Sequence, residues 1–219
     1  MRKVLIAVPM GDPAGIGPEI VVKAVSKKEI QDIARVLVVG DGQILEKAKE
    51  ICKLPLKLKR IEKAEDCGEE KDTLYYLQEG KIPMEEFSYG KVSAMCGAAA
   101  FSYIKKAIEL ANHKEVDAVA TTPINKESLK AAGVPYIGHT EIFGALTWTD
   151  DPLTMFECNG MRVFFLTRHV SLRKMLDMIT KERIKDYVKR CLEALKKLGV
   201  SEGTMAIAGL NPHCGEHGL

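Results

Sequence analysis

Short apolar segments alternate with segments of helical periodicity along most of this chain. The apolar runs are rich in Val, Ile, Leu and Ala and lack alternation with polar residues, which is typical of strands covered on both faces. Strands that alternate with helices predict βαβ units and a parallel sheet. The predicted strands are Val4–Val8, Val36–Val39, Ala118–Thr121, Val163–Leu166 and Met205–Ala208.

Four further segments have the residue spacing of helices with one apolar face. Pro18 suits the first position of one helix, and Thr180 and Gly199 suit the N-terminal cap and the stop of another. The segment from Leu54 to Tyr89 has weak periodicity and many charges, so we expect irregular hairpins or a flap there. The predicted helices are Pro18–Ser26, Gln43–Ile51, Ser93–His113 and Lys181–Leu198.

Composition fits an ordinary globular chain. The 219 residues, 46% hydrophobic and 28% charged, suffice for one large α/β domain or two small lobes. The net charge is +2 without a basic block, which predicts no nucleic-acid partner.

The longest charge-free run, Val92–Ile104, is shorter than the roughly 18–20 apolar residues of a membrane span, so we expect no membrane partner. The N-terminus is predicted to be a first strand rather than a signal peptide, and the six cysteines form no C-x-x-C pair, which indicates reduced thiols in the cytoplasm.

Two loops that follow predicted strands have groups suited to an anion. Gly11–Glu19 is glycine-rich and leads into the first predicted helix, so its backbone amides could face an anion. A tight strand-to-helix turn without a ligand accounts for the same glycines. This loop has neither the dinucleotide nor the P-loop spacing. In the second loop, Thr122, Asn125 and Lys126 offer a hydroxyl, an amide and an ammonium group, which suit a phosphate or a carboxylate. An ordinary capped turn is equally compatible with that loop.

Histidines gather in loops that follow apolar segments. The carboxyl ends of parallel strands meet at one edge of a sheet, so His169 and His213 could begin a divalent metal site, which needs three or four protein ligands. A surface or structural role is the alternative for each histidine. Cys214, beside His213, is expected to be a small buried residue. The histidines in such loops are His139, His169, His213 and His217.

Five short motifs, spread over the whole chain, occur in the order of a known family. Together they resemble the 4-hydroxythreonine-4-phosphate dehydrogenase family of vitamin B6 biosynthesis. Any one of them is weakly specific, and five in register make the resemblance strong. The matching pieces are Gly11-Asp-Pro-Ala-Gly-Ile-Gly-Pro-Glu19, Thr122-Pro-Ile-Asn-Lys126, Gly138-His-Thr-Glu141, Thr167-Arg-His169 and Leu210-Asn-Pro-His-Cys-Gly-Glu216.

The resemblance implies an α/β fold of the three-layer α/β/α, isopropylmalate-dehydrogenase-like type with two lobes. The first lobe is expected over residues 1–125 and the second over residues 126–219. Family members continue past the position of Leu219, and their later segment completes the first lobe, so we expect the C-terminal part of that lobe to be missing. The resemblance also implies a homodimer whose active sites lie at the junction of lobes and subunits.

The resemblance further implies a reaction and its site. The family oxidises 4-phosphooxy-threonine with NAD(P) and a divalent metal (zinc, magnesium or cobalt), and the β-keto acid product decarboxylates on the way to pyridoxal 5'-phosphate. By the family pattern, His139 and Thr140 contact this small phosphorylated hydroxy acid. His169 and His213 match two of the family's three metal ligands, and the third histidine lies beyond Leu219.

Three other functions stay open. Asn125, Arg168 and Cys214 depart from the commoner family residues, so oxidation of a related four-carbon sugar-acid phosphate, erythronate or threonate 4-phosphate, is one alternative. A metal-dependent hydrolase or lyase that uses the same histidines without nicotinamide is another. The third is an inactive, truncated family member.

Overall fold

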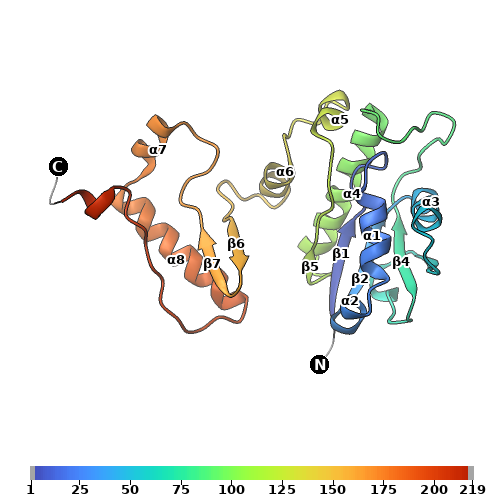
Figure 1. Cartoon of the computed structure of the whole chain (residues 1–219), viewed down its shortest axis with the longest axis horizontal. Helices are drawn as coiled ribbons and strands as arrows, with labels where there is room; N and C mark the ends of the chain where they lie inside the picture. Colours follow the sequence, from blue (N-terminus) through green and yellow to red (C-terminus); the bar gives the residue numbers. More distant parts are fainter. Residues whose placement is uncertain (1–2, 217–219) are drawn as a thin grey trace. The chain divides into compact units, whose positions relative to one another are not determined.

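The structure, a computed structural model, describes residues 3–216 (Figure 1). Its internal contacts divide the chain into two compact units, Met1–Pro152 and Leu153–Leu219, and each is described here by itself. In the part of the chain that is described, no helix has the length and apolar character needed to cross a bilayer.

The first unit contains a five-stranded sheet in which all neighbouring strands run parallel. The strands are β1 (Val4–Pro9), β2 (Ala34–Gly40), β3 (Lys57–Ile61), β4 (Thr73–Gln78) and β5 (Ala118–Val119), in the spatial order β3-β4-β2-β1-β5. The central strands are deeply buried, as their unbroken apolar runs predicted: Leu37, Val38 and Val39 have no exposed surface. The predicted parallel α/β sheet is confirmed.

Helices cover both faces of this sheet. The chain steps from β1 to β2 through α1 (Gly17–Val25) and α2 (Lys28–Ile33), continues through α3 (Gly42–Cys52), and later returns to β5 through α4 (Ala94–Asn112). Crossover connections between parallel strands are right-handed, so connections that run in opposite directions put their helices on opposite faces. Figure 1 shows α1 and α4 on opposite sides of the sheet. The three-layer α/β/α prediction is therefore confirmed.

Two short helices, α5 (Lys126–Ala131) and α6 (His139–Leu146), pack against α4. Their contact is a second apolar cluster, separate from the core beneath the sheet. Residues 126–152 thus belong to the first unit by their contacts, whereas the sequence placed a lobe boundary after residue 125. The buried members of the cluster are Ile104, Ile108, Leu129 and Ile142.

The segment between Leu54 and Tyr89 is not the irregular flap that its charges predicted. It supplies β3 and β4 to the main sheet, with a short 3-10 turn, η1 (Ala64–Asp66), between them. β3 is an edge strand, and edge strands tolerate exposed charged side chains. The charged side chains of β3 therefore hid its strand character, although Ile61 at its end is buried in the core.

The second unit contains an antiparallel hairpin of β6 (Met155–Cys158) and β7 (Met161–Phe164), followed by α7 (Leu172–Met178) and α8 (Lys181–Lys197). The Thr180 hydroxyl caps α8 by accepting from the Arg183 N–H, and Gly199 has a φ of 79° just past its end. Both sequence-derived signals for this helix are confirmed. A 3-10 turn, η2 (Pro212–Gly215), follows near the end of the described residues.

Three expectations for this unit are wrong. The run at Val163–Leu166 was expected in a parallel sheet, but β7 pairs with β6 in an antiparallel hairpin. Met205–Ala208 forms no strand and Ile207 is 64% exposed, because an apolar run becomes a strand only where a neighbour accepts its backbone hydrogen bonds. Cys214 is exposed rather than buried, and no residue of η2 is buried.

Candidate functional site

The first candidate site lies at the carboxyl ends of β1 and β5. From β1 the chain moves to β2 on one side, and it returns later to β5 on the other side, so the strand order reverses between β1 and β5. Open parallel sheets bind ligands outside such a reversal point. The glycine-rich loop follows β1 there, and the loop through Thr122 and Lys126 follows β5.

Glycines allow these two loops to touch. Gly11 has a φ of 80°, and a Cβ on it would overlap the Pro123 carbonyl oxygen and the Thr122 hydroxyl. A Cβ on Gly17 would overlap the Met10 carbonyl oxygen. The glycine pattern is thus required for close packing of the turn, independently of any ligand.

Two of the polar residues predicted to bind an anion instead make hydrogen bonds within the protein. Thr122 is buried, and its hydroxyl donates to the Pro9 carbonyl over 2.7 Å. The Asn125 amide oxygen caps α5 by accepting from the N–H groups of Glu127 and Ser128, at 2.9 and 3.0 Å. The capped-turn interpretation therefore describes both residues.

Lys126, the third predicted anion ligand, is placed differently. It is exposed and has no ion pair among residues 3–216. It lines a cleft of about 550 Å³ together with Asn125 and the glycine-rich loop. Its side chain also passes Gly138, because a Cβ there would be 3.9 Å from the Lys126 Cε. Lys126 therefore lies between the cleft and the start of α6.

A buried carboxylate links the same loops. Asp12 is 3% exposed, its Oδ1 accepts from the Ala14 N–H over 2.8 Å, and the Ser128 hydroxyl also hydrogen-bonds to it. Burial raises the pKa of Asp12, while the two hydrogen bonds favour the charged carboxylate and partly offset that rise. No spacing in the sequence distinguishes Asp12 or Ser128 from its neighbours as a functional residue.

His139 and Thr140, the predicted substrate contacts, open α6. No side chain caps this helix at Gly138, and Thr140 is exposed. His139 is half-buried, and its Nε2 is buried without a hydrogen-bond partner among the described residues. An unsatisfied buried imidazole nitrogen is costly, so it indicates a group that awaits a partner.

We expect His139 to titrate below the ordinary histidine value of 6.5, because burial lowers its pKa by disfavouring the charged form. The unfolded chain then binds a proton that the folded chain does not. The contribution of neutral His139 to stability is present above pH 6.5 and is lost as the pH falls below it.

NMR titration of the His139 ring proton, assigned with a His139→Gln variant, measures this shift. The same resonance in urea gives the unfolded reference value. Equal midpoints in the folded and unfolded chain would contradict the expected effect of burial.

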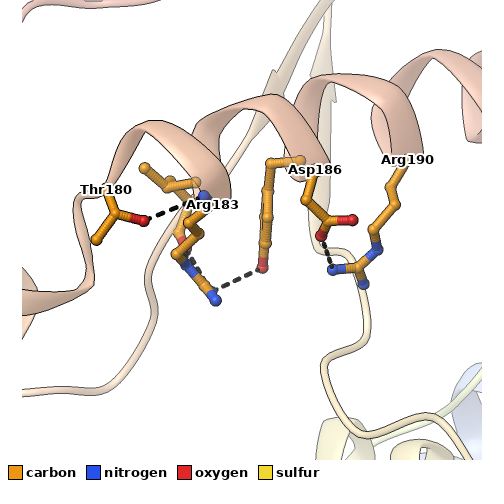
Figure 2. Close-up of polar contacts among 6 residues, drawn as sticks. Thr180, Arg183, Asp186 and Arg190 are labelled. Atoms are coloured by element: carbon orange, nitrogen blue, oxygen red, sulfur yellow. Dashed lines mark hydrogen bonds and ion pairs between the residues drawn. The ribbon is translucent and has the colours of Figure 1, made fainter.

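His169 lies in the second unit, in the loop after β7, and is exposed with a φ of 45°. The loop is held from α8. Arg183 donates to the Leu166 carbonyl from Nε and Nη2, at 3.2 and 2.9 Å, and to the Tyr187 hydroxyl at 3.3 Å. Figure 2 shows the Arg183 side chain on this helix with its polar contacts as dashed lines. Arg168 donates to the Thr154 hydroxyl over 2.8 Å. Two arginines thus fix the backbone on which His169 stands.

His213 lies in the same unit, within η2, and is exposed with a φ of 53°. Imidazole is a suitable ligand for zinc or cobalt, but two imidazoles fall short of the three protein ligands of a catalytic zinc site. Over residues 3–216 no group of three or more metal-binding side chains is assembled, and His217 lies outside the described residues. A metal centre on His169 and His213 therefore stays a proposal.

The chain is similar to known proteins over nearly its whole length. Residues 32–219 match the family described as pyridoxal phosphate biosynthetic protein PdxA. The chain belongs to the PdxA family. The resemblance inferred from the five motifs is confirmed.

Relatives of this PdxA chain carry two different names. A Fusobacterium nucleatum protein named "Putative D-threonate 4-phosphate dehydrogenase" is 59% identical over 98% of the chain, and one of the same name from Halalkalibacterium halodurans is 56% identical over its whole length. A solved 4-hydroxythreonine-4-phosphate dehydrogenase from Burkholderia phymatum superimposes with a TM-score of 0.91 at 36% identity over the whole chain. The PdxA chain spans 64–66% of the length of these three proteins.

Lys91 lines the same cleft as Lys126, and no motif in the sequence points to it. It follows Gly90 in a segment with no regular structure, so no periodicity singled it out. A lone lysine after a glycine has no distinctive spacing. Only the folded backbone brings it to the cleft.

Proposed function

We propose that this chain carries the metal-assisted, NAD(P)-dependent dehydrogenase activity of a PdxA enzyme and acts on a four-carbon hydroxy acid with a terminal phosphate. Membership of a family whose relatives are named dehydrogenases supports the reaction class. One observation supports placing substrate binding at this site. The Lys126 side chain lies beside Gly138, and the next residue, His139, has a buried Nε2 without a hydrogen-bond partner among the described residues. The homodimer and the cytoplasmic location implied by the resemblance belong to the same proposal.

D-Threonate 4-phosphate is the preferred substrate in this proposal. The proteins that carry that name are 54–59% identical to the chain, whereas the solved 4-hydroxythreonine-4-phosphate dehydrogenase is 36% identical. The two substrates differ at carbon 2, which bears a hydroxyl group in one and an amino group in the other. 4-Phosphooxy-threonine, the first expectation from sequence, becomes the second candidate.

Each residue would have a defined task. The ammonium group of Lys126 and the hydroxyl of Thr140 would hold the phosphate, and neutral His139 would hydrogen-bond to the substrate through its buried Nε2. His169 and His213 would supply two metal ligands. A bound divalent metal lowers the pKa of a coordinated hydroxyl, and nicotinamide accepts a hydride. Since Thr122 and Asn125 are used in the fold, they would shape the loop rather than contact the phosphate.

We expect a chain extended to the length of its relatives to form NADH from D-threonate 4-phosphate in the presence of Zn²⁺, Mg²⁺ or Co²⁺, and a chelator to abolish the rate. The 219 residues alone should show little or no turnover, because two imidazoles fall short of the ligands of a catalytic metal site. His169→Ala and His213→Ala should each lower kcat/KM on the order of a hundredfold or more, because even residues that only support a metal ligand contribute about 10–100-fold. His113→Ala, at the end of α4, is the matched control.

Parallel assays with 4-phosphooxy-threonine and erythronate 4-phosphate rank the substrates. Metal-dependent product formation without NAD(P) would favour the hydrolase or lyase alternative. Absence of turnover on every substrate with every metal would instead identify an inactive chain.

A further inference from the structure

The cleft beside β1 and β5 is formed by three chain segments rather than two. The glycine-rich loop contributes Asp12 to Ile16, the loop after β5 contributes Pro123 to Glu127, and the connection from β4 to α4 contributes Gly90 and Lys91. At about 550 Å³, the cleft has the size of a small-molecule site.

Hydrogen bonds tie the third segment to the other two. The Gly90 N–H donates to the Ala14 carbonyl over 2.8 Å, and the Ser93 N–H donates to the Ser128 hydroxyl over 3.2 Å. Ser128 in turn hydrogen-bonds to Asp12, whose N–H donates to the Pro123 carbonyl over 3.2 Å. Lys91 lies between two anchored positions, so the fold itself holds its backbone at the cleft.

The charges that line the cleft are suited to an anion. Lys91 and Lys126 have no ion pair among residues 3–216, whereas Lys23, Lys49 and Lys59 pair with acidic side chains. The Asp12 carboxylate accepts hydrogen bonds from the Ala14 N–H and the Ser128 hydroxyl, so its charge is partly offset by groups of the protein itself. Glu127 is the remaining acidic residue of the lining, and it is exposed.

The lining between the lysines is largely apolar. Ala14, Ile16, Pro123 and Ile124 contribute to it, and Ile16 is 61% exposed although it follows a buried loop. A ligand with a hydrophobic part and a phosphate group would cover Ile16 and neutralise both ammonium groups.

We propose that this cleft is a phosphate-binding site in which Lys91, together with Lys126, is a specificity-determining residue. The inference rests on the proposed function for its ligand class, a phosphorylated small molecule. That phosphate belongs either to the hydroxy-acid substrate or to the diphosphate of the nicotinamide cofactor, and the shared chemistry is an ammonium–phosphate pair.

Isothermal titration of the 219-residue chain with NADH and, separately, with D-threonate 4-phosphate tests the site without turnover. Lys91→Gln should weaken one of the two ligands about fivefold to tenfold, which corresponds to one lost charge-assisted contact at a partly solvated site. The affected ligand identifies the source of the phosphate. Affinity should also fall with added salt, less steeply in Lys91→Gln than in the unchanged chain.

Matched variants separate a local contact from net charge. Lys81→Gln and Lys130→Gln each remove one exposed lysine outside the cleft and should change neither affinity by more than about twofold, since exposed charges are screened. Glu127→Gln removes the exposed acidic residue of the lining and should tighten binding.

Equal affinities in Lys91→Gln and Lys81→Gln for both ligands would overturn the proposal, as would failure of the unchanged chain to bind either one. If turnover is normal and Lys91→Gln changes neither affinity, the proposed function stands and the proposed phosphate site fails. If binding depends on Lys91 but no substrate is turned over, the phosphate site stands and the proposed function fails.

Discussion

Replacing Gly97 with alanine is expected to lower the free energy of unfolding by about 3 kcal/mol, a large effect for one methyl group. Gly97 lies on α4 where α5 crosses it. A Cβ there would overlap the Ser128 carbonyl group and lie 2.8 Å from the Leu129 backbone nitrogen. Backbone atoms cannot rotate away as a flexible side chain does, so α5 itself must move.

Two effects oppose each other at this position. Alanine in place of glycine stabilises a helix interior by about 1 kcal/mol. Overpacking of a tight contact costs about 1–3 kcal/mol and occasionally more, and here the overlap is with backbone. The steric cost therefore dominates, and the displacement of α5 shifts Lys126 from its place in the lining of the cleft.

Urea denaturation of Gly97→Ala measures the loss, with Ala98→Ser as the control because Ala98 is the exposed neighbour on the same helix. The control should change stability by no more than about 0.5 kcal/mol. A variant as stable as the unchanged chain would show that α5 does not need its close approach to α4.

Replacing Arg183 with methionine is expected to cost about 2–3 kcal/mol and to loosen the loop that carries His169. Arg183 makes two hydrogen bonds to the Leu166 carbonyl, and its guanidinium group lies 4.7 Å from the centre of the Tyr187 ring. Hydrogen bonding from a charged donor to this single carbonyl contributes about 1.5–3 kcal/mol in total, and stacking on the aromatic ring adds a smaller amount. Methionine retains the apolar contact with the ring and loses the donors.

Hydrogen–deuterium exchange localises this effect. Amides of residues 166–170 should exchange faster in Arg183→Met, while those of the β6–β7 hairpin change little. Arg183→Lys should recover only part of the protection, because an ammonium group lacks the planar pair of N–H groups, Nε–H and Nη2–H, that converge on the Leu166 carbonyl. Arg173→Met on α7, an exposed arginine, is the control. Unchanged exchange in residues 166–170 would contradict the anchoring role of Arg183.

The sequence predicted the elements whose signals are local. The runs at β1 and β2, the helix that starts at Pro18, and the cap at Thr180 were all readable, because apolar periodicity and end residues act within a few positions along the chain. The same local motifs identified the family, which the match over residues 32–219 confirms.

The wrong predictions concern which strands pair and in which direction they run. β3 and β4 were hidden by charges that an edge strand tolerates, and the run at Met205–Ala208 resembled a strand but has no neighbour to pair with among the described residues. The run that forms β7 was correctly predicted to be a strand, but it was wrongly assigned to a parallel sheet. The sequence of one strand does not indicate whether its partner runs parallel or antiparallel to it.

By itself, the sequence determined the family, the α/β class and which residue types are available for chemistry. The tertiary structure alone decided how those residues are used. It assigned Thr122 and Asn125 to internal hydrogen bonds, left Lys126 exposed, and brought Lys91 to the same cleft from another segment. The physical reason is that a polar side chain is available to a ligand only after the backbone groups around it have found their partners. Some of those partners, such as the Pro9 carbonyl that accepts from Thr122, are distant in sequence.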